Sequence, residues 1–186
     1  MAPPPWGIGQ PQDAFLALAK RGVTRGRVQD VGCGTGEHTL MAAGLGLDAT
    51  CIDLAAKALR SAEDKARDRG LRARFLHHDA RLLADLGERF ETVLDFGLFH
   101  IFEDQDRAAY TAGLRSAVPA GGRYFMLGLS DRQPGEGRGR MRKPTQEEIR
   151  AAFAEGWHAD SIEAATIHIT TDPGGIRAWR AGLTRI

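Results

Sequence analysis

Three glycines alternate with other residues directly after a short apolar run, in the segment VQDVGCGTGEHT at residues 28–39. Glycines spaced in this way let the backbone approach a ligand closely, and a helix starting behind them directs its N–H groups at that ligand. Acids flank the glycines on both sides, at Asp30 and Glu37. Because carboxylates there would repel a phosphate, the loop favours a ligand with positive charge. S-adenosylmethionine, with its sulfonium and ammonium groups, has that charge.

Two further acids end the next two apolar runs. Asp53 closes DATCID, where a carboxylate can accept hydrogen bonds from both hydroxyls of an adenosine ribose. Asp79 closes ARFLHHD, where it would face an adenine amino group. Ligands of open parallel sheets bind at the carboxyl ends of the strands. Acids at three successive strand ends therefore point to this ligand more strongly than any one of them.

The hydrophobic pattern predicts the elements that hold these residues. Expected strands cover 27–31, 48–53, 73–79, 91–99 and 121–130, and expected helices cover 11–22, 35–46, 55–70, 103–118 and a segment ending near 155. The stretches 161–170 and 177–186 alternate in polarity around a short glycine turn, which predicts an antiparallel pair. The predicted fold is α/β: a Rossmann-like, doubly wound, seven-stranded mixed sheet with an antiparallel C-terminal strand pair, in one domain over residues 1–186.

The charge balance argues for a small partner. The chain has 186 residues, with 25 Lys and Arg against 24 Asp and Glu, for a net charge of +1. No global field would draw it to nucleic acid or to an anionic membrane, so neither is expected as a partner. The start, MAPPPWGIG, has no signal-peptide pattern, and no apolar stretch approaches the length of a membrane span. A cytoplasmic location is expected, and the oligomeric state is left open.

The cysteines predict neither a disulfide framework nor a metal site. The chain has two, Cys33 in the glycine loop and Cys51 in an apolar run. We expect reduced thiols, with Cys33 as a small filler and Cys51 as a core residue, and no metal.

Five segments, DVGCGTG, IDL, HHDA, LDFGLFH and PAGGRYFML, resemble in order the motifs of the class I S-adenosylmethionine-dependent methyltransferases, over nearly the whole chain. More narrowly, PWGIGQPQ, GLFHIFED and SDRQPGEG are similar to a bacterial subgroup related to thiopurine S-methyltransferase, which acts on small molecules. The resemblance implies in-line transfer of a methyl group from S-adenosylmethionine to a small-molecule thiol, amine or hydroxyl.

The resemblance also assigns residues to the cofactor. The residues that it implies are Asp30, Gly32, Cys33, Gly34 and Gly36 at the methionine end, Asp53 and Leu54 at the ribose and adenine, Asp79 and Ala80 at the adenine edge, Phe96 or Gly97 near the ammonium, and Trp6 in an N-terminal lid within residues 1–22. Phe96 departs from the family pattern, which has a small residue there, and this predicts a narrower or differently shaped pocket.

One histidine lies where the acceptor should bind. His100 follows the fourth predicted strand, so it is a candidate general base for a phenol or an amine, and a packing or capping role is the alternative. An acceptor thiol would need little help from a base. The Gly- and Arg-containing stretch 131–143 predicts a mobile loop that covers the acceptor site or only connects two elements.

Two other functions are compatible with the same motifs. An RNA-modifying methyltransferase would share the cofactor site, although the balanced charge disfavours it. A non-catalytic module that binds S-adenosylmethionine or a nucleotide would share it as well, because methyl transfer need not leave a catalytic signature in the sequence.

Overall fold

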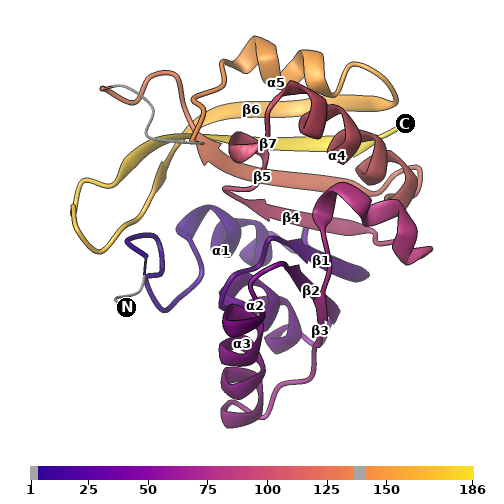
Figure 1. Ribbon diagram of the computed structural model, residues 1–186, viewed down its shortest axis with the longest axis vertical. Coiled ribbons are helices and arrows are strands. Elements are labelled where there is room, and N and C mark those ends of the chain that lie inside the picture. The colour runs from indigo at the N-terminus through magenta and orange to yellow at the C-terminus, as the bar shows by residue number, and fades with distance from the viewer. Residues whose placement is uncertain (1–3, 136–140) are drawn as a thin grey trace.

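A seven-stranded sheet with the strand order β3-β2-β1-β4-β5-β7-β6 forms the centre of the computed structural model, which describes residues 4–135 and 141–186 (Figure 1). The strands are β1 Arg27–Val31, β2 Asp48–Asp53, β3 Arg74–His77, β4 Thr92–Phe96, β5 Arg123–Leu129, β6 Trp157–Ile167 and β7 Ile176–Arg185. Strands β1 to β5 pair in parallel, and β7 pairs antiparallel with both β5 and β6. The predicted mixed sheet with an antiparallel C-terminal pair is confirmed.

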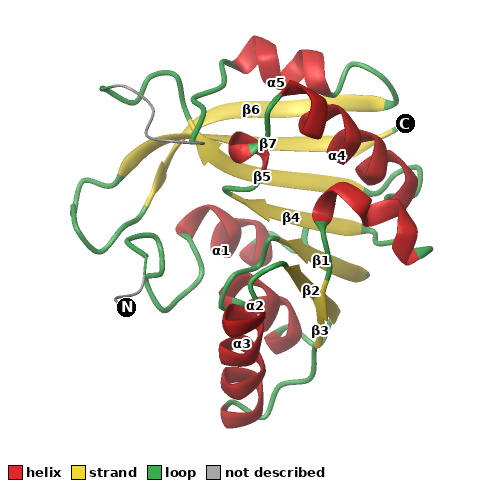
Figure 2. Cartoon of the chain, viewed as in Figure 1, coloured by secondary structure: helices red, strands yellow, loops and turns green. Residues whose placement is uncertain are grey.

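Helices cover both faces of this sheet (Figure 2). They are α1 Asp13–Lys20, α2 Glu37–Gly44, α3 Ala56–Asp68, α4 Asp104–Ala117 and α5 Gln146–Ala152, with 3-10 turns η1 Ala80–Leu86 and η2 Phe99–Ile101. A capping box of Thr145 and Glu148 starts α5, because each side chain accepts a hydrogen bond from the other residue's backbone N–H. No helix in the described part of the chain is both long and apolar enough to cross a membrane.

Strand β5 shows how alternation divides the core into two layers. Tyr124 and Met126 are buried on the face that packs against α4, whereas Phe125 and Leu127 are buried on the face that packs against α1 and α2. Successive side chains of a strand point to opposite faces, so a strand covered on both sides is apolar throughout. This accounts for the unbroken apolar run YFML.

Most element boundaries lie within two residues of the predictions, and three differences are larger or affect the site. The strand expected over 91–99 ends at Phe96, because Gly97 turns the chain with a φ of +77° and the apolar residues beyond it form η2. The C-terminal pair is longer than expected, since β6 begins at Trp157. The turn η1 was not predicted, and it begins where the Asp79 side chain accepts the N–H of Arg81.

The two cysteines correct an expectation. Cys33 and Cys51 are paired as a disulfide, with their Cα atoms 5.7 Å apart, so the prediction of two unpaired reduced thiols is wrong. The cause is the sheet order: β1 and β2 are neighbours, and the loop after β1 crosses β2, where the Cys33 N–H donates to the carbonyl of Ile52 at 3.0 Å. The parallel pairing thus brings together two side chains that are 18 positions apart in the sequence.

Candidate active site

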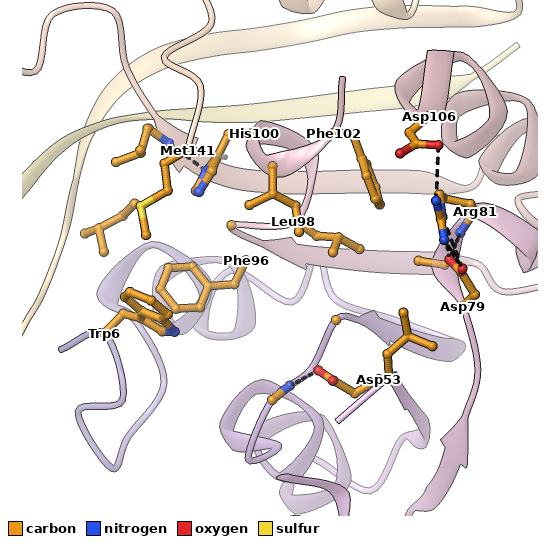
Figure 3. A pocket seen from close by; sticks show the side chains of 18 of the residues that line it. Trp6, Asp53, Asp79, Arg81, Phe96, Leu98, His100, Phe102, Asp106 and Met141 are labelled. Atoms are coloured by element: carbon orange, nitrogen blue, oxygen red, sulfur yellow. Dashed lines mark hydrogen bonds and ion pairs between the residues drawn. The ribbon is translucent and has the colours of Figure 1, made fainter. Parts of the chain in front are cut away.

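A cavity of about 570 Å³ opens at the carboxyl ends of the parallel strands (Figure 3). That volume lies in the range of small-molecule sites. Most residues predicted for the site line it, namely Trp6, Gly32, Gly34, Asp53, Leu54, Asp79, Ala80, Phe96, Gly97 and His100. The other three predicted residues, Asp30, Cys33 and Gly36, do not line the cavity.

The glycine loop forms part of the cavity wall at Gly32 and Gly34. Gly34 has a φ of +55°, and a Cβ added there would meet nothing within 4 Å, so space is left open above this backbone. The Gly34 N–H donates to Asp53 Oδ2 at 2.8 Å, which ties the loop to the end of β2. The loop thus presents bare backbone to the cavity.

Gly36 has a packing role instead. A Cβ at this position would lie 2.7 Å from the Cβ of Ala62 on α3, well inside normal contact distance. The absent side chain lets α3 pack closely against the start of α2. Gly36 therefore allows the helix packing on which the glycine loop rests, and does not face the cavity.

Gly36→Ala is expected to lower the free energy of unfolding by about 1–3 kcal/mol more than Gly46→Ala, because only the first forces an overpacked contact. The two glycines flank α2 with nearly equal φ values, +80° and +79°, and a Cβ at Gly46 meets nothing within 4 Å. The matched control therefore carries the same backbone cost. Urea denaturation of both variants measures the difference, and equal losses would contradict the packing role.

Asp53 is fixed by two backbone groups at the end of β2. Its Oδ2 accepts from Gly34 as above, and its Oδ1 accepts the N–H of Ala55 at 2.7 Å. A carboxylate has about four acceptor positions, so two stay free for further donors. Two neighbouring ribose hydroxyls fit this arrangement, and Leu54 beside it adds an apolar surface to the cavity.

Asp30 lies behind the loop with one oxygen unsatisfied. Its Oδ2 accepts from the backbone N–H and the hydroxyl of Thr39, at 3.0 and 2.7 Å. Its Oδ1 is buried and has no hydrogen-bond partner among the described residues. Burial raises the pKa of this carboxyl to about 7. Because Asp30 does not line the cavity, its observed contacts hold the start of α2 through Thr39, and its predicted contact with the cofactor stays a prediction.

Asp79 is already paired within the protein. Arg81 Nη2 contacts Asp79 Oδ2 at 2.6 Å, and Arg81 Nη1 reaches Asp106 of α4 at 3.2 Å. The hydrogen bonds from Arg81 lower the pKa of Asp79 below its usual range. Arg81 and Asp106 were not among the predicted site residues, although Arg81 directly follows the HHDA motif. An adenine at this end of the cavity would meet a carboxylate that shares its acceptor positions with a guanidinium.

The opposite end of the cavity is apolar, and most of it was not identified from the sequence. Besides Trp6, it is lined by Met141, Ile167 and Ile176, the last two from the facing ends of β6 and β7. Met141 belongs to the stretch 131–143 that was predicted to cover the acceptor site or to connect two elements, whereas no motif marks Ile167 and Ile176, which only the pairing of β6 and β7 brings to the site. Figure 3 shows the indole of Trp6 close to the ring of Phe96 and below Met141.

The N-terminal segment that carries Trp6 is attached to the turn between β6 and β7. The Thr170 N–H donates to the carbonyl of Pro5 at 2.8 Å, and the amide of Gln12 exchanges two hydrogen bonds with the backbone of His168. Trp6 itself is 44% exposed, which leaves much of the indole available to a ligand. Residues 1–3 of the predicted lid and residues 136–140 of the predicted mobile loop lie outside the described residues.

Phe96 lines the cavity and packs against α2. The ring lies edge-on to His38, with ring centres 5.3 Å apart, and His38 also packs against Phe15 of α1. Burial lowers the pKa of His38 to about 3, and its Nε2 accepts the N–H of Gln12. Phe96, which replaces the small residue of the family pattern, is therefore accommodated by packing with His38 and Phe15.

Asp95, near the end of β4, holds the turn that carries Gly97 and His100. Its Oδ1 accepts the N–H of Leu98 at 2.8 Å, and its Oδ2 accepts the hydroxyls of Tyr110 and Tyr124 at 2.8 and 2.6 Å. The carboxyl is fully buried, and burial raises its pKa. Asp95 was not among the predicted site residues, although an acid inside the apolar run TVLDF is a signal for it.

His100 is buried in η2 with one edge on the cavity. Its Nδ1 accepts the N–H of Leu129 at 3.1 Å. Burial lowers its pKa to about 4, and the positive charge of Arg107 acts in the same direction. The imidazole is therefore neutral near pH 7 and has a defined orientation.

Comparison with known proteins agrees with this geometry. Residues 28–122 match the methyltransferase domain family. The 2-heptyl-1-hydroxyquinolin-4(1H)-one methyltransferase of Mycobacteroides abscessus is 30% identical over 92% of this chain and 76% of its own length. The chain belongs to the methyltransferase domain family. It is an S-adenosylmethionine-dependent methyltransferase.

Solved structures show the same fold. A protein described under "Conversion of a Disulfide Bond into a Thioacetal Group during Echinomycin Biosynthesis" superposes with a TM-score of 0.88 at 37% identity, covering 98% of this chain and 84% of that one. Magnesium protoporphyrin IX methyltransferase from Synechocystis, with bound S-adenosylmethionine, superposes with a TM-score of 0.72 at 20% identity, covering 94% and 77%. The second likeness concerns the fold alone.

Proposed function

We propose that this enzyme methylates a small, largely apolar acceptor, which binds between Trp6 and His100. The observation that carries the proposal is the division of the cavity. Its charged lining residues in the described chain are Asp53, Asp79, Arg81 and Asp106, and Figure 3 shows them away from Trp6 and Met141. The acceptor end is thus built to bury apolar surface. The hydroxyquinolinone named for the Mycobacteroides relative supports an acceptor of this kind.

The remaining residues fit the cofactor. Gly32 and Gly34 would hold the methionine end, Asp53 the ribose hydroxyls, and Leu54 and Ala80 the adenine. Bound S-adenosylmethionine supplies an electrophilic methyl carbon, so the protein's own work is to hold the acceptor in line and exclude water.

Trp6 and the segment around it would serve as a lid over the acceptor. The indole can bury more surface than it does now, and the hydrogen bonds to the β6–β7 turn hold the segment over the apolar end. The narrower resemblance to thiopurine S-methyltransferases stays a prediction, and it extends the proposal to aromatic thiols.

Trp6→Ala is expected to raise the KM for an apolar aromatic acceptor about tenfold. The reason is that the exposed part of the indole, 44% of the residue, could no longer bury apolar surface against the acceptor. Affinity for S-adenosylmethionine should stay nearly unchanged. The assay measures release of S-adenosylhomocysteine with a panel of aromatic hydroxyls, thiols and amines as acceptors. Each acceptor is compared with its carboxylated analogue, and an RNA substrate is assayed separately. Leu45→Ala, at an exposed apolar residue outside the cavity, is the control. Preference for the carboxylated analogues or for RNA would contradict the proposal.

A further inference from the structure

We propose that His100 is a hydrogen-bond donor that holds the methyl acceptor as its anion, so the acceptor is a weakly acidic hydroxyl or thiol on an apolar skeleton. The inference rests on the proposed function and names the acceptor class for that same site. It assigns His100 a role opposite to that of a general base.

The hydrogen bond to Leu129 decides which ring nitrogen carries the proton. A backbone N–H can only donate, so Nδ1 of His100 must present its lone pair to the Leu129 N–H, 3.1 Å away. A neutral imidazole has one N–H, and it must then be on Nε2. Figure 3 shows the other edge of the ring directed into the cavity, toward Phe96 and Met141.

Close packing keeps the ring in this orientation. A Cβ at Gly128 would lie 3.3 Å from Nδ1, and a Cβ at Gly97 would lie 3.3 Å from Cε1, so the imidazole fits against two residues without side chains. The carbonyl of His100 also accepts the N–H of Arg142 at 2.9 Å. The Nε2–H therefore has a fixed direction at the edge where the acceptor binds.

General-base chemistry would disrupt this arrangement. To offer a lone pair from Nε2, the ring must move its proton to Nδ1, where it would face the N–H of Leu129. The charged form would place a proton there as well, and burial and Arg107 of α4 oppose that charge. Arg142 directs its guanidinium to Asp104, 2.6 Å away, and Asp106 pairs with Arg81. No carboxylate in the described chain contacts His100 to stabilise an imidazolium.

The surroundings of His100 then determine the acceptor's protonation state. Its neighbours at the apolar end, Trp6, Phe96, Leu129 and Met141, cannot take a proton. A hydroxyl or thiol must therefore lose its proton to water before it binds. Apolar walls disfavour a bound anion by desolvation, whereas a hydrogen-bond donor stabilises the anion more than the neutral form, so the Nε2–H of His100 is the group at this end that offsets the desolvation cost. The cavity thus favours acceptors that ionise readily.

The transfer step balances without a base. A lone pair of the bound oxyanion or thiolate forms the bond to the methyl carbon, while the bond from that carbon to the sulfonium breaks and its electron pair stays on sulfur. The products are a neutral methyl ether or thioether and neutral S-adenosylhomocysteine. The anion and the sulfonium neutralise each other, so no proton moves during the step.

A spectral titration tests the donor without turnover. The probe is 4-nitrophenol, whose anion absorbs at longer wavelength than the neutral form, added to enzyme loaded with S-adenosylhomocysteine. We expect the probe bound to the wild-type enzyme to titrate about one to two pH units below the probe bound to His100→Phe, the scale of a hydrogen bond to a charged group. His100→Gln, which keeps a donor, should retain part of this displacement. The same change at an exposed residue, His158→Phe, should leave it intact.

Turnover supplies the second measurement. With nitrophenols and thiophenols of graded acidity, the rising limb of kcat/KM against pH should follow the pKa of each acceptor, and His100→Phe should lower kcat/KM about 10- to 100-fold without moving the limb. The proposal is overturned if the bound probe stays neutral, if one limb is common to all acceptors, or if acceptors with no ionisable proton are methylated best. Absence of methylation for every acceptor would refute the proposed function, whereas the spectral displacement tests His100 separately.

Discussion

Asp95→Ala is expected to lower the free energy of unfolding by about 3–5 kcal/mol, the largest effect of any single change considered for this chain. The alanine would leave the hydroxyls of Tyr110 and Tyr124 and the N–H of Leu98 buried without their acceptor. Each such group loses its hydrogen bond without regaining water. Urea denaturation with a fitted m-value measures the loss.

The tyrosine partners provide the graded controls. Tyr110→Phe and Tyr124→Phe each remove one hydrogen bond and keep the ring, so each should cost about 1 kcal/mol. A loss below 1 kcal/mol for Asp95→Ala would show that relief of the buried carboxylate offsets the broken bonds, and that the network does not hold the turn.

Asp53→Ala is expected to weaken S-adenosylmethionine binding by about 1.5–3 kcal/mol, roughly 10- to 150-fold, because hydrogen bonds from the ribose hydroxyls to a charged group are lost. The release of the Gly34 N–H adds to this loss, since the glycine loop is no longer tied to β2. Isothermal titration calorimetry measures the affinity.

An acid on the same strand is the control. Asp48 begins β2, is exposed and pairs with Arg27, so Asp48→Ala should leave the affinity unchanged. Unchanged affinity in Asp53→Ala, or tighter binding of NAD than of S-adenosylmethionine, would refute the assignment of this carboxylate to the ribose.

Local residue patterns were sufficient for the fold class and for the cofactor half of the site. β2 matches its predicted limits, and the antiparallel C-terminal pair is present, because alternation and glycine turns are properties of neighbouring residues. Gly34 and Asp53 face one cavity because parallel strands end at the same edge of a sheet. Spacing along the chain is enough to predict these strands and the positions of these two residues at the edge of the sheet.

The other half of the site depends on contacts between distant segments. Ile167 and Ile176 reach the cavity only through the pairing of β5, β7 and β6, and no motif marks them. The Cys33–Cys51 pair likewise depends on β1 and β2 being neighbours.

For His100, the sequence predicted the position, whereas the tertiary structure decided the hydrogen-bond partner. Its place after the fourth strand was evident from the sequence, and it suggested a base. The direction of its proton depends on Leu129, which lies 29 positions along the chain and meets it only because η2 packs against the end of β5. Sequence spacing thus determined which residues approach the ligand edge of the sheet. The tertiary structure alone decided their hydrogen-bond partners, because those partners come from elements that the chain brings together only on folding.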